Sequence, residues 1–143
     1  MMIHLKLVSQ TGLKFNDDVY EVVIPTSDGQ IAVLNDHMPI VTSIQSGVLS
    51  IRRNAKDPDS NLEMFATYGG VVEVKNNQLN ILVDEADHAD SIDQAEVELA
   101  YDKALEMKKN AHDEISLNHA QQLIDRSQIR LQVVNLRKHV TKK

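Results

Sequence analysis

The sequence has no cysteine and no tryptophan, and aromatic residues make up only 3% of its 143 residues. The absence of cysteine excludes disulfide bonds, thiol catalysis and cysteine metal sites, and it fits a chain that faces a reducing cytosol. The shortage of rings predicts a core of aliphatic side chains. The net charge is −6 and no basic cluster is interleaved with aromatic residues, so nucleic-acid binding is disfavoured.

Long apolar runs are also missing. No stretch approaches the roughly 18 apolar residues that a membrane-spanning helix needs. Residues 1–7 alternate between apolar and polar instead of forming a basic region followed by an apolar run. We therefore expect any membrane association to run through a partner.

The common motifs of enzymes are absent as well. The chain contains no nucleophile elbow, phosphate-binding loop, dinucleotide glycine fingerprint or zinc-protease helix. Its six histidines are scattered, and His112 lies in the expected break between helices while His119 directly follows it, so a shared metal site is not indicated. We expect a non-catalytic protein.

Turn-forming residues divide the chain into two parts. All five glycines and all three prolines lie at or before Gly70. In this first part, apolar residues alternate with polar ones from position 3 to 7, and Asn76 and Asn77 form an expected two-residue turn between strands. Many short strands at close spacing predict an antiparallel β-sandwich or flattened barrel, which we place in residues 1–86.

The second part, residues 87–143, has helical spacing. Ser91 followed by Gln94 matches a capping box, and Ile92, Ala95 and Leu99 then recur on one side of an expected helix.

A polar break at 110–118 leads into a second expected helix. Its apolar stripe consists of Ala120, Leu123, Ile124, Ser127, Leu131 and Val134. Two stripes with a short connection predict an antiparallel α-helical hairpin.

Charge is segregated along this hairpin. Residues 85–106 contain eight acids and one base, whereas residues 126–143 contain six bases and no acid. One interpretation is complementarity with the helix dipoles and attraction between the two helices. The other is a basic region that reaches an acidic surface of a partner.

Four segments carry a resemblance to a known family. They are 36–42 (DHMPIVT), 47–49 (GVL), 68–74 (YGGVVEV) and 80–84 (NILVD). In this order, followed by a helical hairpin, they resemble the epsilon subunit of bacterial F-type ATP synthases over the whole chain.

The resemblance implies a sandwich of about ten strands that binds the gamma subunit and sits on the ring of c subunits. It also implies a mobile hairpin, which either packs on the sandwich or rises along gamma to the alpha and beta subunits. The implied function is a non-catalytic rotor subunit that couples proton flow to ATP synthesis and inhibits ATP hydrolysis. The implied location is peripheral, at the cytoplasmic face of the bacterial inner membrane.

Partner contacts follow from the same resemblance. His37, beside Asp36, would face gamma, and Gln30 would lie in a turn near the c-ring, where relatives often carry an acid. An acidic segment of the beta subunit would be the target of the basic second helix, for which the candidates are Arg126, Arg130, Arg137 and Lys138.

Some relatives bind ATP between the folded helices. Ile92 and Asp93 match the start of their motif, and Arg126 and Arg130 match its two arginines on the second helix. Glu96, however, stands where the motif has arginine. A carboxylate there repels phosphate, so we expect weak or absent ATP binding. Alternatively, the two arginines simply pair with acids on the first helix.

A second function remains open from the sequence: a free-standing small-molecule-binding β-sandwich with a helical lid. Stable co-purification with gamma would separate the two interpretations, because a free-standing receptor would elute alone.

Overall fold

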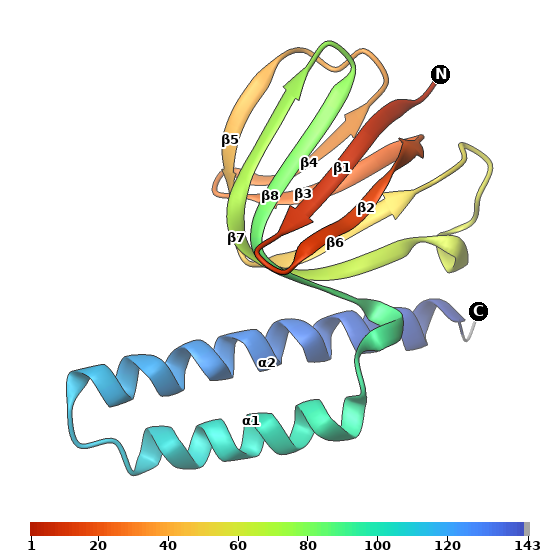
Figure 1. Cartoon of the computed structure of the whole chain (residues 1–143). Coiled ribbons are helices and arrows are strands. Elements are labelled where there is room, and N and C mark those ends of the chain that lie inside the picture. Colours follow the sequence, from red (N-terminus) through yellow and green to blue (C-terminus); the bar gives the residue numbers. More distant parts are fainter. Residues whose placement is uncertain (142–143) are drawn as a thin grey trace.

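The computed structural model describes the backbone of residues 1–141 and the side chains of residues 1–137. It consists of a β-sandwich with an antiparallel pair of helices along one end (Figure 1). The strands are β1 (Ile3–Ser9), β2 (Gly12–Val19), β3 (Glu21–Thr26), β4 (Gly29–Leu34), β5 (Ile40–Ile44), β6 (Gly47–Arg52), β7 (Glu63–Lys75) and β8 (Gln78–His88). The helices are the short 3-10 turns η1 (Asp59–Asn61) and η2 (Ala89–Ser91), then α1 (Gln94–Lys109) and α2 (Glu114–Thr141). The predicted sandwich and hairpin are confirmed.

The strands follow the order β2-β1-β8-β7-β5-β3-β4, with β6 joining β3 to β7. β7 is shared between the layers, because its first half pairs with β6 and its second half with β5. The strand changes partner at Gly69 and Gly70. A side chain at Gly70, where φ is 155°, would come within 2.2 Å of the Leu82 carbonyl oxygen, so the crossing requires glycine.

The described residues form eight strands, where the resemblance implied about ten. The number of strands is lower because β7 and β8 are long. They are continuous strands of 13 and 11 residues, and neither is divided into two where the chain passes from one layer of the sandwich to the other.

Aliphatic side chains fill the space between the layers, as the composition predicts. Ile3, Leu5 and Leu7 of β1 are fully buried, in the alternation expected from sequence. Each such side chain contributes about 1.5–3 kcal/mol to folding. This continuous core gives the sandwich a rigid frame for its loops.

α1 begins two residues later than the capping box predicts. Ser91 belongs to η2, where its hydroxyl donates to the His88 carbonyl at 2.8 Å. The residue before the helix is Asp93, whose carboxylate accepts from the amides of Ala95 and Glu96 at 2.9 and 3.3 Å. Both residues suit a helix start, but the backbone turn of η2 uses the serine.

The predicted apolar stripe of α1 is wrong at Ala95 and Leu99, since Ala95 is exposed and Leu99 is 63% exposed, whereas Ile92 is buried just before the helix begins. The buried residues of this helix are Val97 and Ala104. α1 packs mainly against α2, and α2 in turn contacts β6 and β7.

The stripe of α2 is confirmed at Ala120, Ile124, Ser127 and Val134, which are all buried. The connection between the helices is shorter than predicted and covers only residues 110–113. Neither helix, over the described residues, combines the length and the apolar character needed to cross a membrane.

Candidate functional site

The hairpin meets the sandwich through an apolar contact that is separate from the sandwich core. The contact contains Val48, Met64, Ala66, Tyr68, Ala89, Ile92, Val97, Val133 and Val134. Strands β6 and β7, η2 and both helices contribute to it. Among the described residues this contact has nine buried members, half as many as the eighteen of the sandwich core, so it buries less apolar area than the core does.

A polar cluster lies at the edge of this contact, formed by Tyr68, Asp87 and Arg130, which we call the anchor cluster. The Tyr68 hydroxyl donates to Asp87 Oδ2 at 3.1 Å, and Arg130 Nε donates to the same oxygen at 2.9 Å. The Arg130 guanidinium also lies over the Tyr68 ring, 5.5 Å from its centroid. The anchor cluster therefore ties α2 to β7 and β8 at one point.

Burial defines the chemistry of the anchor cluster. Tyr68 is 3% exposed, and burial raises the pKa of its hydroxyl far above the ordinary value. The hydroxyl thus stays protonated and donates at every physiological pH. Arg126 lies over the same ring at 5.1 Å, so two cations of α2 contact one aromatic ring.

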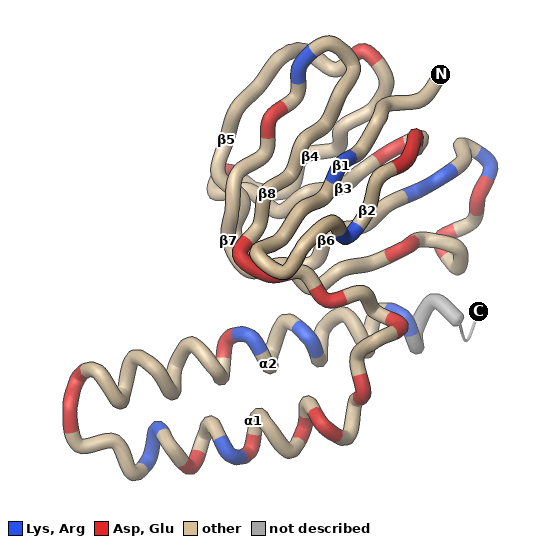
Figure 2. Tube along the Cα trace, viewed as in Figure 1, with Lys and Arg blue, Asp and Glu red and all other residues tan. Residues whose placement is uncertain are grey.

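A second polar contact lies near the end of α2. Arg137 donates to Asp90 Oδ1 at 2.7 Å and to the Ala89 carbonyl at 2.9 Å. Figure 2 shows the acidic positions gathered along the segment that leads from β8 into α1, beside the C-terminal half of α2. The fourth predicted basic residue, Lys138, has a side chain outside the described residues.

These contacts refine the interpretation of the charges. We predicted that Arg126 and Arg130 could pair with acids on the first helix. Arg130 instead pairs with Asp87 on β8, and Arg137 pairs with Asp90 in η2. The arginines of α2 therefore hold the hairpin to the sandwich rather than to its own first helix.

The residues proposed for ATP binding only partly meet. Ile92, Asp93, Glu96 and Arg130 line one hollow of about 270 Å³, together with Asp87.

Arg126 lines a different hollow, next to Asp84 and Asp125. The two arginines that the motif would use together thus line different hollows, although both guanidinium groups lie against the Tyr68 ring.

The electrostatics of the first hollow oppose a phosphate chain. Its lining has three carboxylates, those of Asp87, Asp93 and Glu96, against the single cation of Arg130. The N-terminus of α1 would attract an anion. The Asp93 carboxylate already accepts its free amides, and Arg130 is already bound to Asp87.

The predicted partner contacts of the sandwich lie at two places. His37 and Asp36 belong to the loop between β4 and β5, where His37 is half-buried and Asp36 is exposed. Gln30 is exposed at the opposite end of β4, beside the turn at Ser27 and Asp28. The strand between them spans about 20 Å, so these residues form two separate contacts.

An apolar row crosses the outer face of the sheet. Val71 on β7 is opposite Leu82 on β8, which is opposite Val8 on β1, and Val8 is opposite Leu13 on β2. Leu82 is 60% exposed and Leu13 is 56% exposed. Val41, at 68%, lies beside the row on β5. Such a contiguous apolar strip on an exposed sheet face is typical of a protein contact.

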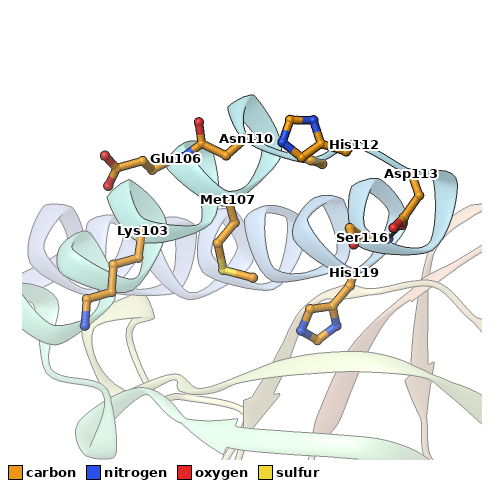
Figure 3. Close-up of a pocket in the computed structure, with 9 residues that line it drawn as sticks. Lys103, Glu106, Met107, Asn110, His112, Asp113, Ser116 and His119 are labelled. Atoms are coloured by element: carbon orange, nitrogen blue, oxygen red, sulfur yellow. Dashed lines mark hydrogen bonds between the residues drawn. The ribbon is translucent and has the colours of Figure 1, made fainter.

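A further hollow of about 570 Å³ lies at the hairpin tip (Figure 3). Figure 3 shows His112 on the connection between the helices and His119 on α2, with rings that do not meet. Among the described residues, no group of three or more histidines and carboxylates is placed to hold a metal ion.

Sequence reasoning missed the partners of the basic helix. In the sequence, Tyr68 stood out only as part of the 68–74 segment, and Asp87 only as one of the eight acids in residues 85–106. The pairing of Asp87 with Arg130 joins residues 43 positions apart. No local pattern identifies such a pair.

Known proteins resemble this chain along nearly its whole length. The family model described as "ATP synthase, Delta/Epsilon chain, beta-sandwich domain" matches residues 2–89. The chloroplastic ATP synthase epsilon chain of Chlorella vulgaris is 34% identical over 134 residues, which cover 94% of this chain and 96% of that one. The ATP synthase epsilon chain of Chloroflexus aggregans is 33% identical over 138 residues, or 96% of each chain.

Solved structures show the same fold. A chain of the Euglena gracilis mitochondrial ATP synthase, determined with OSCP, F1 and the c-ring, matches with a TM-score of 0.76. The match covers 92% of this chain and 79% of that chain at 20% sequence identity, so it shows a common fold and no more.

Proposed function

This chain belongs to the ATP synthase delta/epsilon family, and we propose that its helical hairpin is a reversible inhibitor of ATP hydrolysis that the anchor cluster holds in an inactive position. In this family the chain takes the place of the epsilon chain, a non-catalytic subunit of the central stalk. We predicted residues 1–86 for the sandwich and 87–143 for the hairpin. Because β8 continues to His88 and η2 follows to Ser91, the part that stays with the rotor extends through η2, and the helices α1 and α2 move.

The single observation that carries the proposal is the pairing of Arg130 with Asp87. In the folded-down position this arginine is bound to the sandwich and cannot reach another acid. When the hairpin leaves, Arg130 and Arg137 both lose their carboxylate partners. Two arginines 7 positions apart then lie two helical turns from each other, ready for an acidic segment of the beta subunit.

Several features make the movement reversible. The hairpin contact has half as many buried residues as the sandwich core over the described part of the chain, and its polar contacts are partly exposed. Partly exposed ion pairs contribute little each, typically about 0–1 kcal/mol. Two states that differ by a few kcal/mol are the condition for a switch.

The gamma subunit is the proposed partner of the outer apolar row. The row runs over β2, β1, β8 and β7 and is continued by Val41, which follows directly on the loop that carries His37. The α2 helix covers β6 and the first half of β7, so this face remains available with the hairpin folded down. Gamma would therefore bind the sandwich in both hairpin positions.

The c-ring is the proposed neighbour of the turn beside Gln30. An amide there provides hydrogen bonds without charge, so this contact is less sensitive to salt than an ion pair. Bound to the ring in this way, the chain would sit peripherally at the cytoplasmic face of a bacterial inner membrane.

The experiment that tests the inhibitory role compares two forms of the chain. ATP hydrolysis by the purified catalytic head is measured with the full chain and with a chain that ends at Ala89. We expect the truncated chain to bind gamma and to allow faster hydrolysis. Equal rates with gamma binding intact would contradict the inhibitory role and leave a coupling subunit.

A further inference from the structure

Three residues with left-handed backbone lie together at the end of the sandwich remote from the hairpin. They are Asp36, with φ of 63°, Asn76, with 52°, and Asn77, with 61°. The first lies in the loop between β4 and β5, and the other two form the turn between β7 and β8. Figure 1 shows this loop and this turn at the same end as the N-terminus.

The side chain of Asn77 joins its own turn to the N-terminal segment and to the loop between β4 and β5. Its Nδ2 donates to the Met2 carbonyl at 2.9 Å and to Asn35 Oδ1 at 3.0 Å. Its Oδ1 accepts from the Asp36 amide at 2.9 Å. Both N–H groups and the carbonyl oxygen of the amide are therefore used, by residues 75, 42 and 41 positions away.

The turn itself does not require this side chain. A two-residue hairpin turn with positive φ at both positions takes glycine most readily at its second position. Asn76 occupies the first position, and its exposed side chain takes part in none of these hydrogen bonds. Asn77 occupies the position where glycine would serve, so its side chain has another role.

That role concerns the loop between β4 and β5. The bond from Asn77 fixes the Asp36 amide at the start of the loop. Next along the chain, the His37 amide donates to the Leu34 carbonyl at 3.2 Å, and His37 Nδ1 donates to the Met38 carbonyl at 2.8 Å. A carbonyl only accepts, so the proton sits on Nδ1 and Nε2 is left for a partner.

The loop thus presents a fixed set of contact groups. Met38 projects with 72% of its surface exposed, and His37 lies beside it. A loop held in its bound shape avoids most of the entropy cost of ordering upon binding.

We infer that Asn77 is a positioning residue that holds the His37 loop in the shape that binds the gamma subunit. This inference rests on the proposed contact between that loop and gamma. Asn77 itself does not touch the partner, and it acts through the Asp36 amide. A carboxamide is needed because one group must both donate and accept.

The test uses the full chain with two matched variants of the same turn. Asn77→Gly removes the side chain and keeps a residue suited to positive φ, while Asn76→Gly makes the same change one position earlier. We expect Asn77→Gly to weaken gamma binding about tenfold, as measured by calorimetry, because the loop must then be ordered on binding. Asn76→Gly should bind as the native chain does.

Two further readouts separate positioning from general stability. Amide hydrogen exchange should become faster at Asp36 and His37 in Asn77→Gly, with exchange in the core strands unchanged. Asn77→Asp keeps the acceptor for the Asp36 amide and loses both donors, so its affinity should fall between native and Asn77→Gly. Unchanged affinity in both Asn77 variants would overturn the inference.

A control distinguishes failure of this inference from failure of the proposed contact. The double variant His37→Ala, Met38→Ala removes the contact groups and leaves the Asn77 bonds in place. If it binds gamma as the native chain does, the loop is not a gamma contact, and both the proposed contact and the positioning role of Asn77 are wrong. If it binds weakly while Asn77→Gly binds normally, only the positioning role is wrong.

Discussion

The sandwich and the hairpin of this chain are stabilised in opposite ways. In the sandwich, residues from all its strands join one aliphatic core, and side chains such as Leu5 and Leu79 are completely buried. In α1, only Val97 and Ala104 of 16 residues are buried. The hairpin depends on α2, a small apolar contact and a few polar bonds to stay on the sandwich.

The difference shows how one short chain can combine a fixed part with a movable part. Removing the hairpin leaves the sandwich core intact, because the two apolar clusters share no residue. Detachment therefore exposes little of the surface that stabilises the sandwich. Four changes, from the largest expected effect to the smallest, test this comparison.

The largest effect is expected in the sandwich core. Leu79→Ala removes a fully buried side chain of β8 and should lower the free energy of unfolding by about 2–5 kcal/mol. Leu82→Ala, on the same strand but 60% exposed, should change it by less than about 0.5 kcal/mol. Urea denaturation measures both, and equal losses would contradict the proposed core.

The nucleotide hollow should respond next most strongly. The native chain should bind ATP only weakly, whereas Glu96→Arg should raise the affinity roughly 10- to 100-fold by adding a charge-assisted contact. Glu98→Arg makes the same charge change outside the hollow and should have little effect. Calorimetry measures the affinities, and clear micromolar binding by the native chain would be evidence against the repulsion described above.

Releasing the anchor cluster should have a moderate effect on hairpin position. Asp87→Asn weakens the bond to Arg130 and should shift the equilibrium about tenfold toward the detached state. Because the chain has no cysteine, fluorescent labels at Ile115→Cys and Lys56→Cys report the distance between hairpin tip and sandwich. Asp28→Asn, at an exposed position in the turn between β3 and β4, is the charge-matched control, and a shift of equal size there would show that overall charge, not the anchor cluster, sets the equilibrium.

The smallest effect is a pH dependence of the β1–β2 edge. A hydrogen bond to Asp18, at 2.7 Å, raises the pKa of His4 above its ordinary value. Its contribution to stability is therefore complete below about pH 6.5, the ordinary histidine pKa, and is lost as pH rises through the raised value. An NMR titration of His4 should show the raised pKa, and Asp18→Asn should return it toward normal.

Local patterns were sufficient to predict most of the fold. The turn at Asn76 and Asn77 and the buried alternation of β1 depend on neighbours in sequence, and both are confirmed. The predicted start of α1 was wrong because Ser91 and Asp93 are both good capping residues, and only the backbone path of η2 decides between them.

The contacts of the candidate sites could not be predicted in the same way. Arg130 bonds to Asp87, and Asn77 bonds to Met2 and Asp36, only once the fold has brought these distant residues together. Sequence does contain one indirect signal, since asparagine stands where this turn would accept glycine. The face that Leu99 presents was also unpredictable, because α1 has one neighbouring helix and leaves most of its surface to water.

The most direct test of the account is ATP hydrolysis by the purified catalytic head, measured with the native chain and with Asp87→Asn. This variant frees the hairpin and leaves every positive charge of α2 in place. If the anchor cluster restrains an inhibitory hairpin, Asp87→Asn slows hydrolysis below the rate with the native chain, while Asp28→Asn leaves it unchanged. A rate equal to or above the native one, with the labels reporting a detached hairpin, would contradict the account.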